Sequence, residues 1–301
     1  QDMKILFMVL IILLGFFLKR VGIFKVEDSK VLTKIMLYVT LPAILLNAFR
    51  DFKFDGSMFA VLLIGFVANV LLTVLGKVIG KNCDGKIRAM YMICFAGYNI
   101  GSFSLPFVQK FFPASMLITV VMFDIGNTIM CAGGTYSFAA IEDDGNSKFS
   151  FKALGKNLVS AFPFDLYISL FILSLLNFKF PERIYEIATL ISGANIVVVM
   201  LMLGILFEVH LTKEARGQII TIVAFRYIFA ALASVFVYFV TPFDISVKQI
   251  VVLLLFSPMT SMATIFCGKL ECDHSVYGTA TSLTIPISIA VMVGLLLVWN
   301  A

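Results

Sequence analysis

The chain has 301 residues, of which 60% are hydrophobic and 14% charged, and its formal net charge is +5. Its mean hydropathy of +1.02 exceeds what a soluble core needs, so the composition indicates an all-α polytopic membrane protein. The basic residues are scattered singly, which argues against a nucleic-acid partner. Two histidines and five dispersed cysteines show no metal-binding spacing, so no metal site is expected.

Ten apolar segments can be marked along the chain, and most are long enough to cross a bilayer with some tilt. The first is interpreted as a membrane helix and not a signal peptide, because Lys19 and Arg20 follow it directly and no small-residue cleavage site is visible. The segments cover residues 3–19, 30–49, 57–80, 87–110, 113–139, 155–177, 181–208, 215–240, 247–268 and 274–299.

A polar linker at residues 141–150, expected to be cytoplasmic, divides the segments into five plus five. Residues 1–140 form the first five-helix repeat and residues 151–301 the second. Because each half has an odd number of helices, the second half must cross the membrane inverted relative to the first. The sequence therefore predicts ten transmembrane helices arranged as two inverted repeats.

The second and seventh segments carry small or polar residues at corresponding places. Pro42 is expected to kink the second segment, and Asn47 follows it. Asn195 ends a short run of small residues in the seventh segment. Tight helix packing alone explains the small residues, whereas the two asparagines are predicted to line a substrate cavity.

The fourth segment is interrupted by the sequence "GYNIGSFSLP" at residues 97–106. Gly97 and Gly101 permit the helix to unwind, and Pro106 is a further helix-breaking residue. Asn99 or Ser102 can then cap the half-helix that follows. The residues predicted to bind substrate here are Asn99, Ile100, Gly101 and Ser102.

Asp124 lies near the middle of the fifth segment, and Asn127 follows on the same helix face. A carboxylate at that depth is costly and is a functional candidate by default. The pair is predicted to carry a coupling proton or to help bind sodium. A structural carboxylate satisfied by neighbouring hydroxyl groups is an equally weighted alternative.

Arg226 and Asp165 are two further charges inside apolar segments, the eighth and the sixth. Each can reach toward the cytoplasmic interface, or the two can neutralise each other. A sharper hypothesis makes Arg226 the partner of a substrate carboxylate, since its planar fork suits that group.

The ninth segment is interrupted by "FSPMTS" at residues 256–261. Ser257 is expected to be the N-cap of a half-helix and Pro258 its first residue, with Thr260 and Ser261 completing the site. Two such helix N-termini meeting at mid-membrane would form an anion site from backbone dipoles. The alternative is a pair of proline kinks without a ligand.

The tenth segment carries Pro286, which is counted among the helix-breaking residues, and several hydroxyl side chains. Hydrogen bonds within the helix around Pro286 explain those hydroxyl groups most simply. Enzyme signatures are absent: no nucleophile motif has a histidine base, and no glycine-rich phosphate loop is present. We therefore expect neither an enzyme nor an ATP-driven pump.

Three segments in order resemble the auxin efflux carrier family, within the larger group that includes the bile acid–sodium symporters. They are "LYVTLPAILLNAF" at 37–49, "GYNIGSFSLPFV" at 97–108 and "FSPMTSMATIFCGKLECD" at 256–273. Phe162 stands where the family often has Asn, and the eighth segment lacks the proline that usually follows its arginine. The short linker resembles the microbial members of the family.

The resemblance implies a scaffold of helices 1, 2, 6 and 7 and a mobile transport unit of helices 3–5 and 8–10. Broken helices 4 and 9 would cross at the substrate site, and the protein would be a homodimer embedded in membrane lipid. Family substrates are typically organic anions. No resident cofactor is implied, and coupling to H⁺ or Na⁺ is left open.

Together these features predict a secondary transporter that moves a small organic anion, such as a carboxylate, by elevator-type alternating access. A sodium symporter of the bile-acid type is the nearer alternative, and it would need more acids and amides near the breaks. A non-transporting membrane sensor with the same fold is the other alternative.

The distribution of basic residues predicts the orientation in the plasma membrane. Of the 23 Lys and Arg residues, 15 lie in loops that follow odd-numbered helices, and 7 lie at the N-terminus or in the even-numbered loops. Cytoplasmic loops are enriched in these residues. Both termini and the loop around Lys110 are therefore expected to be extracytoplasmic.

Cysteine labelling tests this orientation. On a cysteine-free background, a membrane-impermeant thiol reagent added to intact cells should leave Gly145→Cys unlabelled and should label Lys110→Cys. The reverse pattern would overturn the assignment.

Overall fold

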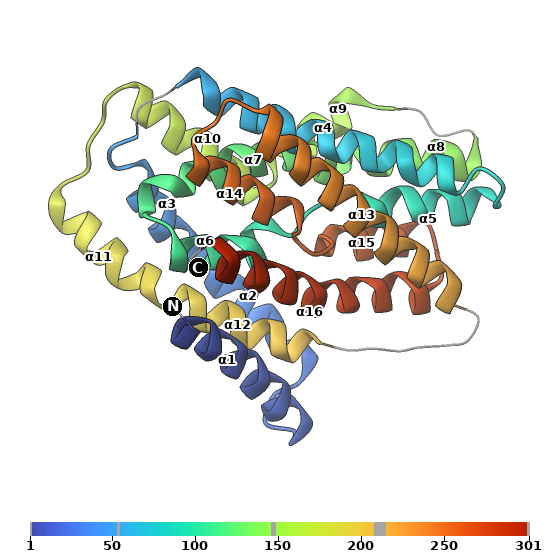
Figure 1. Cartoon of the computed structure of the whole chain (residues 1–301), viewed down its shortest axis with the longest axis horizontal. Helices are drawn as coiled ribbons and strands as arrows, with labels where there is room; N and C mark the ends of the chain where they lie inside the picture. Colours follow the sequence, from blue (N-terminus) through green and yellow to red (C-terminus); the bar gives the residue numbers. More distant parts are fainter. Residues whose placement is uncertain (1, 53–54, 146–148, 208–214, 300–301) are drawn as a thin grey trace.

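A computed structural model describes residues 2–52, 55–145, 149–207 and 215–299, and these residues form helices and connecting loops without a β-strand (Figure 1). The first half contains α1 (Asp2–Arg20), η1 (Val26–Asp28), α2 (Ser29–Ile35), η2 (Met36–Thr40), α3 (Leu41–Phe49), α4 (Gly56–Ile79), α5 (Gly85–Phe95), η3 (Ile100–Ser104), α6 (Leu105–Phe111), η4 (Ala114–Met116), α7 (Leu117–Ile129), η5 (Met130–Gly134) and α8 (Thr135–Asp144). The second half contains α9 (Phe151–Val159), α10 (Phe162–Leu175), α11 (Glu182–Gly193), α12 (Asn195–Leu206), α13 (Arg216–Val240), α14 (Ile245–Leu255), α15 (Ser261–Lys269) and α16 (His274–Trp299).

Six helical stretches of the described chain are long and apolar enough to cross a membrane. Five of them also expose several large apolar side chains, as lipid contact requires, whereas Ala114–Asp143 is mostly buried in the protein. The prediction of an all-helical, multi-pass membrane protein is therefore confirmed. The stretches are Val26–Phe49, Gly56–Ile79, Ala114–Asp143, Glu182–Leu206, Arg216–Val240 and His274–Trp299.

Helices cover the apolar segments marked in the sequence, but the sixth segment is broken where continuity was expected. α9 ends at Val159 and α10 begins at Phe162. Pro163 lies in the first turn of α10, where its missing N–H is tolerated, and it could not continue a helix that entered from α9. Within the linker, α8 continues to Asp144, while residues 146–148 lie outside the described part.

Two Leu-Pro pairs each follow a π-helical turn. η2 precedes Pro42 and η3 precedes Pro106, so the chain widens where each proline ring would clash with the carbonyl four residues earlier. Pro286 lies inside the uninterrupted α16, so the expectation of a helix break there is wrong.

The helices pack into two groups, which contact each other through α3, α7 and α10. In one group, α1 lies along α12, and α3 packs against α10 and α11. The α1–α12 contact is close because both helices place a glycine there: a Cβ at Gly204 would lie 2.1 Å from the Ile12 carbonyl oxygen. Small residues permit such backbone approach in membrane helices.

The second group contains α4, α5, α7 and α8 from the first half and α13–α16 from the second. A separate apolar cluster joins this group to the first one through buried Met and Phe side chains from both. Its aromatic and thioether members are Met8, Met36, Phe103, Phe107, Met200, Met202 and Met292.

Candidate functional site

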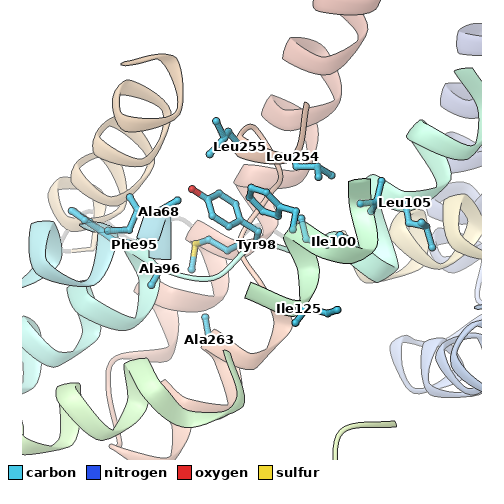
Figure 2. Close-up of a cluster of buried hydrophobic side chains, with 14 of the residues drawn as sticks. Ala68, Phe95, Ala96, Tyr98, Ile100, Leu105, Ile125, Leu254, Leu255 and Ala263 are labelled. Carbon is cyan, nitrogen blue, oxygen red and sulfur yellow. The ribbon is translucent and has the colours of Figure 1, made fainter. Parts of the chain in front are cut away.

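The two predicted interruptions lie against each other in the protein interior. The chain is extended between α5 and η3 and again between α14 and α15, and Tyr98 pairs with Met259 in an antiparallel bridge. The Asn99 N–H donates to the Pro258 carbonyl at 3.0 Å, and the Thr260 N–H donates to the Gly97 carbonyl at 3.4 Å. Figure 2 shows Tyr98 and Ile100 among side chains from both halves, including Leu254, Leu255 and Ala263.

Gly97 is required by the close approach of these two segments. Its φ of +80° is a conformation that residues with a Cβ rarely adopt. A Cβ at this position would also lie 2.4 Å from the Thr260 Cγ2 atom. Gly101 is different, since a Cβ there would meet no atom within 4 Å.

Two buried asparagines hold the backbone of the first break. Asn69, from α4, accepts the Gly97 N–H at 2.6 Å through its side-chain oxygen. Asn127, from α7, accepts the Tyr98 N–H and donates to the Tyr98 carbonyl, both at 3.0 Å. The two amides are joined at 3.2 Å. Asn127 therefore has a structural role besides any role in coupling.

The caps of the half-helices differ from the expectation. Helix α15 begins at Ser261 with Thr260 as its N-cap, and the Thr260 hydroxyl accepts the Met262 N–H at 3.4 Å. The proposed Ser257 cap is wrong, because pairing with the first break keeps residues 258–260 extended. Ser257 instead hydrogen-bonds Ser104, and the Asn99 side chain accepts the Ser102 hydroxyl at 2.9 Å.

Arg226 is buried, with 5% of its surface exposed. It lies where the two breaks begin, away from the half-helices that follow them. Its guanidinium group donates to the carbonyls of Cys94, Phe95, Ala96, Gly97 and Ser257. Asp165 is exposed in the first turn of α10 and forms no ion pair with Arg226 within the described part of the chain. The suggestion that the two charges neutralise each other is therefore wrong.

Asp124 is buried in the middle of α7, and its two oxygens accept from different parts of the molecule. One accepts the Asn127 amide at 2.9 Å, and the other accepts the Tyr167 hydroxyl of α10 at 2.8 Å. Neither partner carries a positive charge. The second hydrogen bond ties the helix group of α7 to that of α10.

A cavity of about 490 Å³ lies beside the breaks. Its walls come from the start of both half-helices, from α7 with η5, from α9 with α10, and from α2 with η2. Eight predicted site residues line it: Asn99, Ile100, Gly101, Ser102, Asp124, Asn127, Thr260 and Ser261.

Four predicted binding residues do not line this cavity. Ser257 and Pro258 lie in the second break but away from its walls. Asn195 is buried between Thr40 and Gln109, which it contacts at 2.7 and 3.3 Å. Asn47 accepts the Thr189 hydroxyl at 3.4 Å. The two asparagines therefore join helices elsewhere, and the prediction that they line the cavity is wrong.

Several polar residues of the cavity wall were not predicted from the sequence, among them Asn157, Tyr167 and Lys269. Asn157 and Lys269 are exposed near its edge, and Tyr167 is buried against Asp124. Asn69, which supports the break from outside the cavity, was also missed. Its position as a lone amide in the most apolar part of the third segment was the signal available.

A multi-pass helical protein with a polar cavity at two helix breaks has the architecture of a membrane transport protein. The family model described as membrane transport protein matches residues 2–157, and the chain belongs to this family. The resemblance to the auxin efflux carriers is confirmed, and the chain is a transport protein, not an enzyme. It is also 24% identical to an uncharacterized transporter of Methanocaldococcus jannaschii over 310 positions, which cover 96% of this chain and 95% of the relative.

The support of the first break by Asn69 can be tested by mutation. Asn69→Ala leaves the buried Gly97 N–H without its partner and should lower stability by about 1–3 kcal/mol. Asn157→Ala, which removes an exposed amide bonded to the Ala132 carbonyl, is the matched control and should change stability by less than about 0.5 kcal/mol. Thermal unfolding in detergent measures both variants. Equal stability of the two would contradict the assigned role.

Proposed function

We propose that this protein is a secondary transporter that moves a small organic anion, such as a carboxylate, across the plasma membrane. The observation that carries the proposal is the cavity into which the first turns of both half-helices open. The leading N–H groups of a helix have no partner within it, and its N-terminus carries partial positive charge. Two such ends in one cavity favour an anion over a neutral or cationic substrate.

The other cavity side chains fit an anion of limited size. Thr260 and Ser261 provide hydroxyl groups, and Lys269 places a positive charge at the edge. Apolar walls from Met36, Leu37, Leu41, Ile100 and Phe266 provide room for the carbon part of the ligand. Such a combination suits a small organic anion better than an inorganic ion.

Asp124 supports coupling to protons. An ionised Asp124 and an anionic substrate in one cavity repel each other, and a proton on Asp124 removes that repulsion. Anion binding and proton uptake would then favour each other by thermodynamic linkage. Sodium coupling is the alternative, but both carboxylate oxygens already accept from protein donors, and Tyr167 and Asn127 bring no further acid.

We propose alternating access by an elevator movement within ten transmembrane helices built as two inverted repeats. The α1, α2–α3, α9–α10 and α11–α12 segments would be the scaffold, and the group containing α4–α8 and α13–α16 the moving unit. The Met-rich cluster between the two supports sliding, because flexible thioether side chains adapt to changed neighbours. A non-transporting sensor with this fold would need the cavity but not an interface that slides.

We propose, from the charge bias, that the cavity mouth faces the cytoplasm. The exposed cavity residues Asn157, Ser160 and Lys269 adjoin loops assigned to the cytoplasm. The described conformation would then be open to the inside, with both termini outside. Assembly as a homodimer in the lipid bilayer stays a prediction.

Substrate binding is tested by thermal stabilisation of the detergent-solubilised protein with a panel of mono- and dicarboxylates. Asn99→Ala and Gly101→Leu, which alter and fill the cavity, should abolish stabilisation by the active ligand while keeping the unliganded melting temperature within a few degrees. Asn47→Ala is the matched control outside the cavity and should bind normally. The proposal would be contradicted if no anion stabilised the wild type, or if Asn47→Ala lost ligand stabilisation to the same extent as the cavity variants.

Coupling is tested in proteoliposomes with Asp124→Asn, which resembles the protonated carboxyl in shape. The variant should retain exchange of substrate across the membrane but lose accumulation driven by a pH gradient. If the variant instead loses a sodium response, and the wild type shows little pH dependence, Asp124 would bind sodium. Unchanged accumulation under both gradients would make Asp124 structural and leave the anion gradient and membrane potential as driving forces.

A further inference from the structure

Arg226 donates hydrogen bonds to five backbone carbonyl oxygens. Within the described part of the chain, it forms no ion pair with a carboxylate. Three of the carbonyls belong to the last residues of α5 and the residue after it, and the others to Gly97 and Ser257 in the two breaks. Carbonyl oxygens at the C-terminal ends of broken membrane helices are also the groups that coordinate metal cations in transporters. The guanidinium group therefore occupies a cage suited to a cation.

The surroundings of Arg226 fit a permanent positive charge. The C-terminus of a helix carries about half a negative charge, so α5 stabilises a cation at this place. The Tyr98 ring adds a cation–π contact, with the guanidinium carbon 5.5 Å from its centre. The neighbouring Tyr227 hydroxyl is directed elsewhere, toward Thr284 and Ser288 of α16 at 2.8 Å.

We infer that Arg226 is a tethered cation that takes the place of a bound metal ion at the junction of the two breaks. It is a positioning residue, because it holds the backbone of residues 94–97 and does not line the substrate cavity. The junction consequently needs no sodium to keep its shape. Removal of the guanidinium should leave a carbonyl-lined hole with affinity for a small cation.

Charge is thereby divided between the two sides of the junction. The fixed cation lies at the C-terminal end of the preceding half-helix, and the substrate anion of the proposed function would lie at the N-terminal ends of the following ones. The earlier hypothesis that Arg226 binds the substrate carboxylate is not supported by this geometry. The inference concerns the empty transporter and holds whichever anion is carried.

Thermal unfolding without substrate tests the inference. Arg226→Ala should lose roughly 5 °C or more in melting temperature, since several buried carbonyls lose a charged donor. Guanidinium ion at millimolar concentration should restore part of this loss saturably, and sodium chloride should restore more than choline chloride at equal ionic strength. Arg216→Ala, at the exposed start of the same helix, is the matched control and should show neither loss nor rescue.

The wild type provides a second measurement that does not depend on the folding of a variant. Its melting temperature should be the same in sodium and choline chloride. A saturable stabilisation of the wild type by sodium would overturn the inference, as would an Arg226→Ala variant that is fully stable or that neither cation rescues. Because no substrate is present, these outcomes are independent of whether a carboxylate is transported.

Discussion

The structure depends on how unpaired backbone groups are satisfied where two helices break inside an apolar protein. Each break exposes N–H and C=O groups that neither lipid nor a dry interior tolerates. The two breaks solve part of the problem by pairing with each other at Tyr98 and Met259. Asn69, Asn127 and Arg226 satisfy most of the remainder from three other helices. Asn69 of α4, Asn127 of α7 and Arg226 of α13 are thus buried for a common reason.

This constraint explains which features were readable in the sequence. Hydropathy located the helices, because every stretch facing lipid or the interior must be apolar over its whole length. Clusters of glycine, proline and hydroxyl residues located both breaks, because several such residues together disfavour a continuous helix, whereas the single Pro286 did not break α16. The pairing of the breaks followed from their equivalent positions in the two halves and from the family resemblance.

The partners of the breaks were harder to predict, because they depend on three-dimensional contacts between distant segments. Nothing in the local sequence of Arg226 distinguishes a residue that binds carbonyls from one that binds a substrate. Asn47 and Asn195, like Asn99, are asparagines within apolar segments, yet they join helices outside the cavity. Helix α15 begins at Ser261 and not at the predicted Pro258, because a long-range backbone pairing took precedence over a favourable local cap.

In the proposed mechanism, the same buried network connects Asp124 to both the proposed substrate site and the proposed moving unit. Asn127 accepts the Tyr98 N–H and also donates to Asp124. A single side chain therefore connects the carboxyl group to the first break. Through Tyr167, Asp124 also holds the two helix groups together. Hydrogen bonds to an ionised carboxylate are about twice as strong as those between neutral groups. Ionised Asp124 should therefore favour the described arrangement, and a proton that neutralises it should weaken the tie to α10 while admitting the anion. One side chain could in this way make movement of the unit conditional on joint occupancy by proton and substrate.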